Sequence, residues 1–238
     1  AIQTLEELKL YGFNYIKFTG GEPFIREDFL NILNYAKKLN FDFDLSTNAS
    51  FINEEISRKL HLLQLQFIHV SLDGYNLESH EFVRGKKSFD KTMAGLKNLL
   101  KYNKNIRLGC VIHSQNDNHL SKIVSLANQL KVKEIIFSMM SPIGRMDKNS
   151  TSVSKKSPQE LIEIISQISS EYTKVNHNLR SDLQPISFTK SEKACPGGDD
   201  FLFIDSIGTV SPCTWISEKL PQFHLLSLHQ YTLGEILN

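Results

Sequence analysis

The segment Tyr15-Ile16-Lys17-Phe18-Thr19-Gly20-Gly21-Glu22-Pro23 joins a short apolar run to a turn with two consecutive glycines. Consecutive glycines let a backbone approach a ligand where a side chain would block it. Glu22 adds a carboxylate suited to an amino group, and Pro23 stiffens the exit from the turn. The segment predicts a strand that ends in a ligand-binding loop. An ordinary surface turn is the alternative for so short a motif.

The same order of strand and helix repeats along the chain. Residues 14–19, 42–47, 67–72, 106–112 and 134–139 are short, largely apolar runs, and apolar residues recur at helical spacing between them. Such runs are typical of strands in a parallel sheet, each followed by a crossover helix. Ser88 and Asn118 are expected to be the N-caps of two helices, and Ser157-Pro158-Gln159-Glu160 to begin another. The sequence therefore predicts an α/β fold.

Composition excludes several classes of protein. The 238 residues carry a formal net charge of +1, so no nucleic-acid partner is expected. No apolar run approaches the roughly 20 residues of a membrane span, so no membrane association is expected either. Three widely spaced cysteines do not form a secreted disulfide framework. These features predict a cytoplasmic protein.

Polar residues follow one expected strand after another. They lie in residues 20–23, 46–48, 71–74 and 80–85, and ligand-binding residues of parallel α/β barrels gather at the carboxyl ends of the strands. Polar loops also occur there without any function, and a surface salt bridge is an equal alternative for Arg84. Cys110 lies in the fourth expected strand and His113 comes directly after it, and we expect both to be core or wall residues rather than catalysts.

Together these segments resemble radical S-adenosylmethionine (SAM) enzymes, and the resemblance covers most of the chain. The matching motifs are Gly-Gly-Glu-Pro at 20–23, Ser-Thr-Asn at 46–48, Ser-Leu-Asp-Gly at 71–74 and the following Arg84-Gly85. The resemblance implies a partial parallel (β/α)6 barrel over residues 1–172. It also implies a SAM-binding set that comprises Gly20, Gly21, Glu22, Pro23, Ser46, Asn48, Ser71, Asp73, Arg84 and Ile143.

The resemblance assigns roles within that set. The Gly-Gly-Glu loop would meet the amino group of the methionine part of SAM, and Arg84 would meet its carboxylate, which a bidentate guanidinium fits well. The second and third strand ends would lie near the methionine and the ribose, and Ile143 would border the adenine. No catalytic residue is assigned.

A second signature lies at Cys195 and Cys213. The spacing is C-x12-G-x4-C, and residues 201–205 and 208–211 read as a hairpin whose turn Gly208 permits. It resembles a SPASM or twitch auxiliary-cluster domain, expected at 173–238 as a small β-hairpin domain. The two thiolates would then be ligands of an auxiliary [4Fe–4S] cluster. A structural zinc site and two unrelated buried thiols are the alternatives.

The three-cysteine motif that holds the SAM [4Fe–4S] cluster in this family, usually C-x3-C-x2-C, does not occur in the sequence. We therefore expect a fragment of a longer enzyme, truncated at both ends and inactive alone. The resemblance implies that the whole enzyme cleaves SAM reductively to a 5′-deoxyadenosyl radical for hydrogen abstraction. It further implies a peptide or protein substrate, in peptide or protein maturation, and an electron donor such as ferredoxin or flavodoxin.

Two other functions remain open from the sequence. One is a non-catalytic degenerate barrel that serves as a peptide-binding scaffold. The other is an ordinary α/β enzyme for a phosphorylated metabolite, for which the expected Gly-rich loop opening a helix is not seen.

Overall fold

Six parallel strands form the main sheet of the protein. The computed structural model describes residues 1–140, 152–171, 176–177, 201–213 and 226–237. The strands lie in the sheet in their chain order: β1 (Tyr15–Phe18), β2 (Asp42–Thr47), β3 (Ile68–Ser71), β4 (Ile106–Ile112), β5 (Glu134–Met139) and β6 (Asn176–His177). Sequential parallel order with helical crossovers is the pattern of a partial α/β barrel. The predicted fold class is confirmed.

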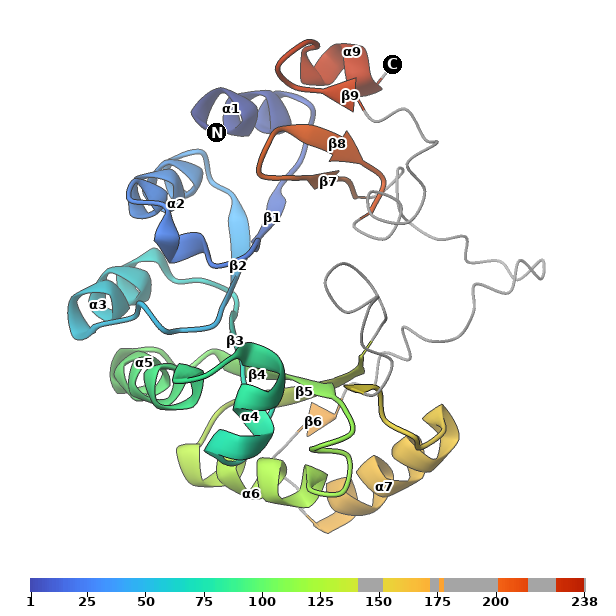
Figure 1. Ribbon diagram of the computed structural model, residues 1–238. Helices are drawn as coiled ribbons and strands as arrows, with labels where there is room; N and C mark the ends of the chain where they lie inside the picture. Colours follow the sequence, from blue (N-terminus) through green and yellow to red (C-terminus); the bar gives the residue numbers. More distant parts are fainter. Residues whose placement is uncertain (141–151, 172–175, 178–200, 214–225, 238) are drawn as a thin grey trace.

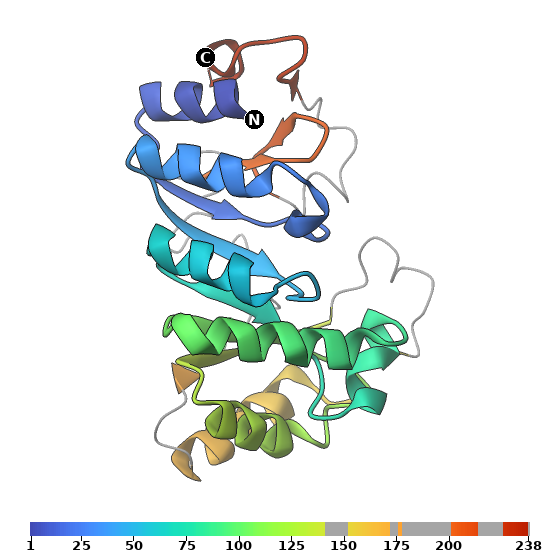
Figure 2. The ribbon, with the colours of Figure 1, turned by 90° about the vertical axis from the view of Figure 1, so that its left-hand side faces the viewer.

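Helices cover one face of this curved sheet. Figure 1 shows the strands as an arc with the helices on its outer side. They are α1 (Ile2–Leu10), α2 (Phe29–Lys38), α3 (Glu54–Leu63), α5 (Ser88–Tyr102), α6 (Leu120–Leu130) and α7 (Pro158–Glu171). The short helices η1 (Pro23–Ile25) and α4 (Leu77–Arg84) lie at the edge where the strands end, on the right-hand side of Figure 2. The opposite face of the sheet is the inner face of the arc.

The core lies between the sheet and these outer helices. Leu45, Leu108 and Phe137 are buried strand residues, and Leu33 and Leu60 meet them from α2 and α3. Burying a large apolar side chain contributes roughly 1.5–3 kcal/mol, so this layer is the main source of stability. Side chains alternate between the two faces of a strand, so the residues between these core positions face the inner side.

The five strands expected from the sequence are all present, but two helix starts differ from the prediction. Ser88 is the first residue of α5 rather than its N-cap, because the preceding Lys87 takes the left-handed conformation (φ 63°). The Ser88 hydroxyl donates to the carbonyl of Gly85 at 2.7 Å instead. His119, not Asn118, precedes α6. The predicted capping box at 157–160 is confirmed, since the Glu160 amide donates to the Ser157 hydroxyl at 3.2 Å.

A small antiparallel sheet follows near the C-terminus. Its strands are β7 (Phe203–Ile204), β8 (Thr209–Ser211) and β9 (Leu226–Ser227), and Gly208 turns the β7–β8 hairpin with φ 82°. The predicted hairpin is thus confirmed. The final helix, α9 (Leu233–Leu237), lies beside α1 in Figures 1 and 2, and the Leu233 amide donates to the Glu7 carboxylate at 2.8 Å.

Within the described parts of the chain, no helix is both long enough and apolar enough to cross a bilayer.

Candidate functional site at the carboxyl ends of β1 to β4

Two glycines leave open space after β1. Gly20 has φ 148°, a conformation that residues with a Cβ atom rarely adopt. A Cβ atom built on Gly20 or Gly21 meets no described heavy atom within 4 Å outside its chain neighbours. The loop therefore offers exposed backbone beside open space, as a ligand-binding loop requires. It projects at the carboxyl edge of the sheet, on the right-hand side of Figure 2.

Glu22 ties this loop to the end of β2. Its side chain is buried, and its Oε1 accepts from the Thr47 hydroxyl at 2.7 Å. Its Oε2 accepts from the Asn48 amide, also at 2.7 Å. The next residue, Pro23, is buried and opens the short helix η1. Oε1 also accepts from the Phe24 amide at 3.4 Å, so both of its lone pairs are used. Oε2 has one donor among the described residues and retains acceptor capacity for a ligand amino group.

Thr47 is a site residue that the sequence analysis missed. Its hydroxyl donates to Glu22 and accepts from the Ala49 amide at 2.9 Å, so it joins two loops. Thr47 faces the outer helices, whereas the predicted Ser46 is half-buried on the inner face. Its position inside the Ser-Thr-Asn motif at 46–48 could have named it as a candidate, but its bond to Glu22 could not be read from the sequence.

The loop after β2 is held by α5. The Asn48 side chain accepts from the Ser50 amide at 2.8 Å, and its carbonyl accepts from the Thr92 hydroxyl at 2.9 Å. Ala49 has φ 61°. Its carbonyl approaches α5 so closely that a Cβ atom on Gly95 would lie 1.9 Å from the oxygen. Backbone strain of this kind persists where the surroundings fix it, and it often marks functional loops.

Asp73, two residues beyond the half-buried Ser71, is the centre of a buried network. Its side chain is 1% exposed, and its Oδ1 accepts from the Val111 amide at 2.8 Å. Its carbonyl accepts from the Asn116 side chain at 2.7 Å, and its amide donates to His80 Nδ1 at 3.2 Å. The ends of β3 and β4 are therefore joined through one residue.

Arg84 makes a partly buried ion pair with Asp73 rather than a surface salt bridge. Its Nε donates to Asp73 Oδ2, and its side chain is 34% exposed. A guanidinium has five N–H donors, and this contact uses one of them. Among the described residues no partner is seen for the two Nη groups. The ion pair thus orients Arg84 and leaves donors for a carboxylate.

Two buried histidines support this network. Burial lowers the pKa of His80 to about 4 and lowers the pKa of His113 as well. Both are neutral near pH 7, and each forms a hydrogen bond with the backbone of Asp73. Phe82 stacks on His113 with ring centroids 5.4 Å apart. The network was not predicted, since its bonds join three separate loops.

The structure describes two of the three cysteines and does not describe Ile143. Cys110 is fully buried, and burial raises the pKa of its thiol well above the ordinary range, which agrees with a core role. Cys213 lies just beyond β8 and is half-buried. Ile143 and Cys195 lie outside the described residues. Among the residues that are described, no group of three or more His, Cys, Asp or Glu could hold a metal ion. These residues therefore provide no ligand set for an iron–sulfur cluster.

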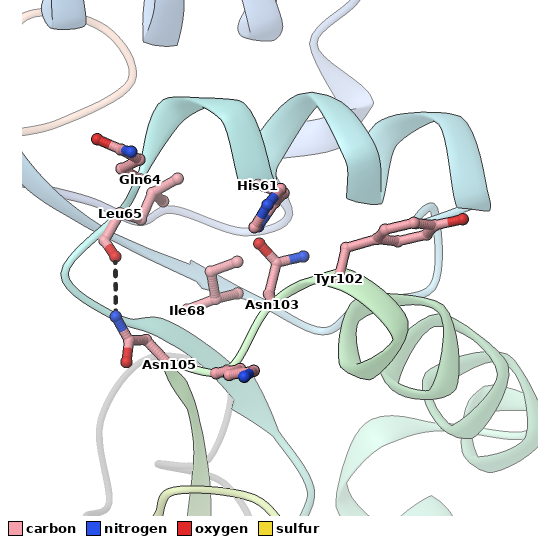
Figure 3. Close-up of a pocket in the computed structure, with 8 residues that line it drawn as sticks. His61, Gln64, Leu65, Ile68, Tyr102, Asn103 and Asn105 are labelled. Atoms are coloured by element: carbon pink, nitrogen blue, oxygen red, sulfur yellow. Dashed lines mark hydrogen bonds between the residues drawn. The ribbon is translucent and has the colours of Figure 1, made fainter.

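A cavity of about 260 Å³ lies at the other edge of the sheet (Figure 3). It is lined by His61 near the end of α3 and by residues of the loops that lead into β3 and β4, including Asn103 and Asn105. The Asn103 amide nitrogen already donates to Ser57 and to the Leu99 carbonyl. The cavity thus lies at the amino ends of the strands, away from the residues predicted to bind SAM.

The carboxyl edge has the chemistry to hold a zwitterionic amino acid moiety. The glycines supply open space, Glu22 Oε2 supplies an acceptor for an ammonium group, and Arg84 supplies donors for a carboxylate. The methionine part of SAM carries both of these groups. The described residues therefore fit SAM.

Sequence comparisons identify relatives of the chain. Residues 1–127 match the radical SAM superfamily. The chain is 26% identical over 234 residues to an AdoMet-dependent heme synthase of Methanosarcina barkeri, covering 89% of this chain and 66% of that protein. It is 31% identical over 138 residues to a probable GTP 3′,8-cyclase of Saccharolobus islandicus, covering 57% of this chain and 44% of that protein. The chain spans less than two thirds of these relatives.

Solved structures share the fold. The SuiB structure of Streptococcus suis with bound S-adenosylmethionine aligns over 99% of this chain and 57% of its own, with a TM-score of 0.78 and 18% identity. The anSMEcpe structure with bound AdoMet aligns over 100% of this chain and 70% of its own, with a TM-score of 0.74 and 19% identity. With its first 127 residues matched and this fold, the chain belongs to the radical SAM superfamily.

Proposed function

We propose that the carboxyl edge of β1 to β4 binds SAM for radical chemistry on a peptide or protein. The observation that carries the proposal is the open space beside Gly20 and Gly21, next to a buried Glu22 that is anchored to β2. Bound SAM supplies the group that, after one-electron reduction, abstracts hydrogen from a substrate. The chain's own part is to hold the methionine moiety and fix its orientation.

Within this proposal the predicted residues have distinct roles. Gly20 and Gly21 give the cofactor access to the backbone, and Glu22 receives its ammonium group. Arg84, held by Asp73, binds the carboxylate. Asn48 and Ser71 line the adjoining strand ends, where the ribose is proposed to lie. Ser46 is proposed to border the methionine, and Ile143 the adenine.

A peptide substrate is supported by the fold. One SuiB structure contains the precursor peptide SuiA, and one anSMEcpe structure contains the Kp18Cys peptide. Both share the fold of this chain at TM-scores of 0.78 and 0.70. We propose peptide or protein maturation for the whole protein, with a ferredoxin or flavodoxin as electron donor.

The C-terminal region is proposed to be an auxiliary iron–sulfur domain of SPASM or twitch type, from residue 173 onward. Its support is the small antiparallel sheet, at whose end Cys213 lies, together with the C-x12-G-x4-C spacing. Cys195 is proposed as the second ligand. Iron and sulfide analysis after anaerobic reconstitution, with Cys213→Ala as the variant, tests this domain separately from the SAM site.

Two arginine–aspartate pairs test the SAM site. Arg84 pairs with Asp73, while Arg26 pairs with Asp28 on an exposed surface nearby. We expect Arg84→Gln to weaken SAM binding at least tenfold and Arg26→Gln to leave it unchanged. The measurement is the dissociation constant of SAM and the formation of 5′-deoxyadenosine by the reconstituted product of the complete reading frame. Equal behaviour of the two variants would contradict the assigned site, and absence of 5′-deoxyadenosine would favour the scaffold function.

A further inference from the structure

The cavity at the amino ends of β3 and β4 lies apart from the site proposed for SAM. Its volume of about 260 Å³ is just below the roughly 300 Å³ of the smallest usual ligand pockets. Leu65 and Ile68 line it and are buried, so they give it an apolar floor. Four exposed lining residues surround its mouth: His61, Gln64, Lys104 and Asn105. The cavity therefore has room for a small molecule with an apolar body and polar ends.

Asn103 presents a hydrogen-bond acceptor to this cavity. Its side chain is buried, and its amide nitrogen donates to the carbonyl and hydroxyl of Ser57 and to the Leu99 carbonyl. Two carbonyl acceptors on the nitrogen fix the orientation of the carboxamide, so the oxygen faces the other way. Within the described part of the chain no donor reaches this oxygen, yet it is not one of the fully buried unpaired atoms there. In Figure 3 the oxygen and the His61 ring point toward one another, so an O–H or N–H group of a ligand could reach it.

The charged groups around the cavity favour an anionic ligand. Lys104 lines the cavity, and its ammonium has no bonded partner among the described residues. The Lys133 ammonium donates to the side chain of Asn105, another lining residue, at 3.0 Å. The Tyr102 hydroxyl donates to Glu54, but that carboxylate also accepts from two cations of its own surroundings. The negative charge of Glu54 is thus offset, and the two lysines leave the cavity with a positive balance.

We propose that this cavity is a second ligand site, for a small carboxylate whose apolar body carries an O–H or N–H donor. The donor bonds the Asn103 oxygen, the apolar body covers Leu65 and Ile68, and the carboxylate lies toward Lys104. The inference goes beyond the proposed function and does not depend on it, because no residue that lines the cavity belongs to the proposed SAM site.

The test uses three small probes that differ in one group each. The first, 4-hydroxybenzoate, has an apolar ring, a phenolic O–H donor and a carboxylate. Benzoate lacks the donor, and 4-hydroxybenzamide replaces the carboxylate with a neutral amide of similar shape. Ligand-observed NMR on the product of the complete reading frame measures the dissociation constant of each probe. We expect 4-hydroxybenzoate to bind at least fivefold more tightly than either of the others. If it did not bind, or if either of the others bound equally well, the proposal would be overturned.

A lysine substitution tests the charge of the site. Lys104→Gln should weaken the binding of 4-hydroxybenzoate at least threefold, because it removes the unpaired ammonium at the cavity. It should change the binding of the neutral 4-hydroxybenzamide less than twofold. The matched control is Lys91→Gln, since Lys91 is exposed near the other end of α5 and does not line the cavity. This control should leave the binding of both probes unchanged.

A second substitution locates the site through its wall. His61 is exposed in the last turn of α3, so His61→Ala keeps the helix while it removes a ring from the cavity. It should weaken both 4-hydroxybenzoate and 4-hydroxybenzamide at least threefold. Leu62→Ala is the control, because Leu62 is 78% exposed on the same helix and does not line the cavity. Wild-type affinity for 4-hydroxybenzoate in both His61→Ala and Lys104→Gln would contradict the proposal.

The outcomes separate this inference from the proposed function. Binding of 4-hydroxybenzoate that depends on His61 and Lys104, in a protein that does not bind SAM, would contradict the SAM site and support the cavity. Binding of SAM without such binding of 4-hydroxybenzoate would do the reverse.

Discussion

The two edges of the main sheet are built from the same βα units but differ in what their loops hold. At the carboxyl edge, buried charged groups such as Glu22 and Asp73 join one loop to the next, beside glycines with open space. At the amino edge, the cavity in Figure 3 is lined by exposed or already bonded groups. Cross-loop bonding of buried charges therefore favours the carboxyl edge as the site, whereas cavity volume alone would favour the amino edge.

The largest effect should come from removing the centre of the carboxyl-edge network. Asp73→Ala leaves the Val111 amide without its acceptor and removes the counter-ion of Arg84. We expect the free energy of unfolding to fall by about 3 kcal/mol, because a buried ion-pair member and its backbone bond are lost together. Urea unfolding measures this. The exposed pair gives the control, since Asp28→Ala should cost far less than Asp73→Ala. If both variants lost the same free energy of unfolding, the Asp73 network would be no more important for stability than an exposed ion pair.

The second-largest effect should be a loss of stability in the carboxyl-edge network at acid pH. The folded pKa of His80 is about 4, below its ordinary 6.5, so the unfolded chain takes up the proton first as pH falls. The contribution is fully present above pH 6.5 and is lost toward pH 4, by about 3 kcal/mol at most. His113, whose pKa is also lowered, acts in the same direction. Stability curves from pH 7 to 4 should be steeper for the wild type than for His80→Gln, and parallel curves would refute this.

Thr47 tests whether the link between the β1 and β2 loops matters. Thr47→Val keeps the shape but removes the hydroxyl that bonds Glu22 and the Ala49 amide. We expect a loss of about 1–2 kcal/mol in unfolding free energy and several-fold weaker SAM binding. Ser46→Ala, on the neighbouring residue and the opposite face, should change stability by less than about 0.5 kcal/mol. If Ser46→Ala lowered the free energy of unfolding more than Thr47→Val, other contacts would have to hold Glu22.

The smallest effect is expected from glycine substitutions at two residues in the left-handed conformation, one at each edge of the main sheet. Gln64 has φ 54° beside the cavity, and Ala49 has φ 61° at the carboxyl edge. Gln64→Gly should raise stability by about 0.5–1 kcal/mol, because glycine relieves the backbone strain. Ala49→Gly should bring no gain, since it also removes a fully buried methyl group worth about 0.8 kcal/mol. Thermal melting of both variants distinguishes these outcomes.

Much of the fold was accessible from the sequence because the strands are short apolar runs and the turns carry glycine. The glycine pair at 20–21, the strand ends at 46–48 and 71–74 and the hairpin at 201–211 are local patterns, and the structure places them as expected. The buried roles of Thr47, His80 and Asn116 were not accessible. Their hydrogen bonds join residues 7 to 43 positions apart, so no local spacing signals them.

Helix starts illustrate the same limit on a smaller scale. Ser88 and Asn118 are good N-cap residue types, yet each lies one position from the cap that forms. At Ser88 the left-handed Lys87 takes the cap position, and the hydroxyl bonds backward to Gly85 instead. Cap preference fixes the region of a helix start, while the path of the preceding loop fixes the residue.

The central claim is that SAM binds at the carboxyl edge beside Gly20 and Gly21. Gly21→Val tests it most directly, because a Cβ atom there meets no described heavy atom within 4 Å and the added side chain would fill the space proposed for the cofactor. Equilibrium dialysis of SAM against the product of the complete reading frame, with Lys104→Ala at the opposite edge as control, gives the measurement. The account predicts at least tenfold weaker binding for Gly21→Val with an unchanged melting temperature, and no change for Lys104→Ala. Wild-type affinity in Gly21→Val would contradict it.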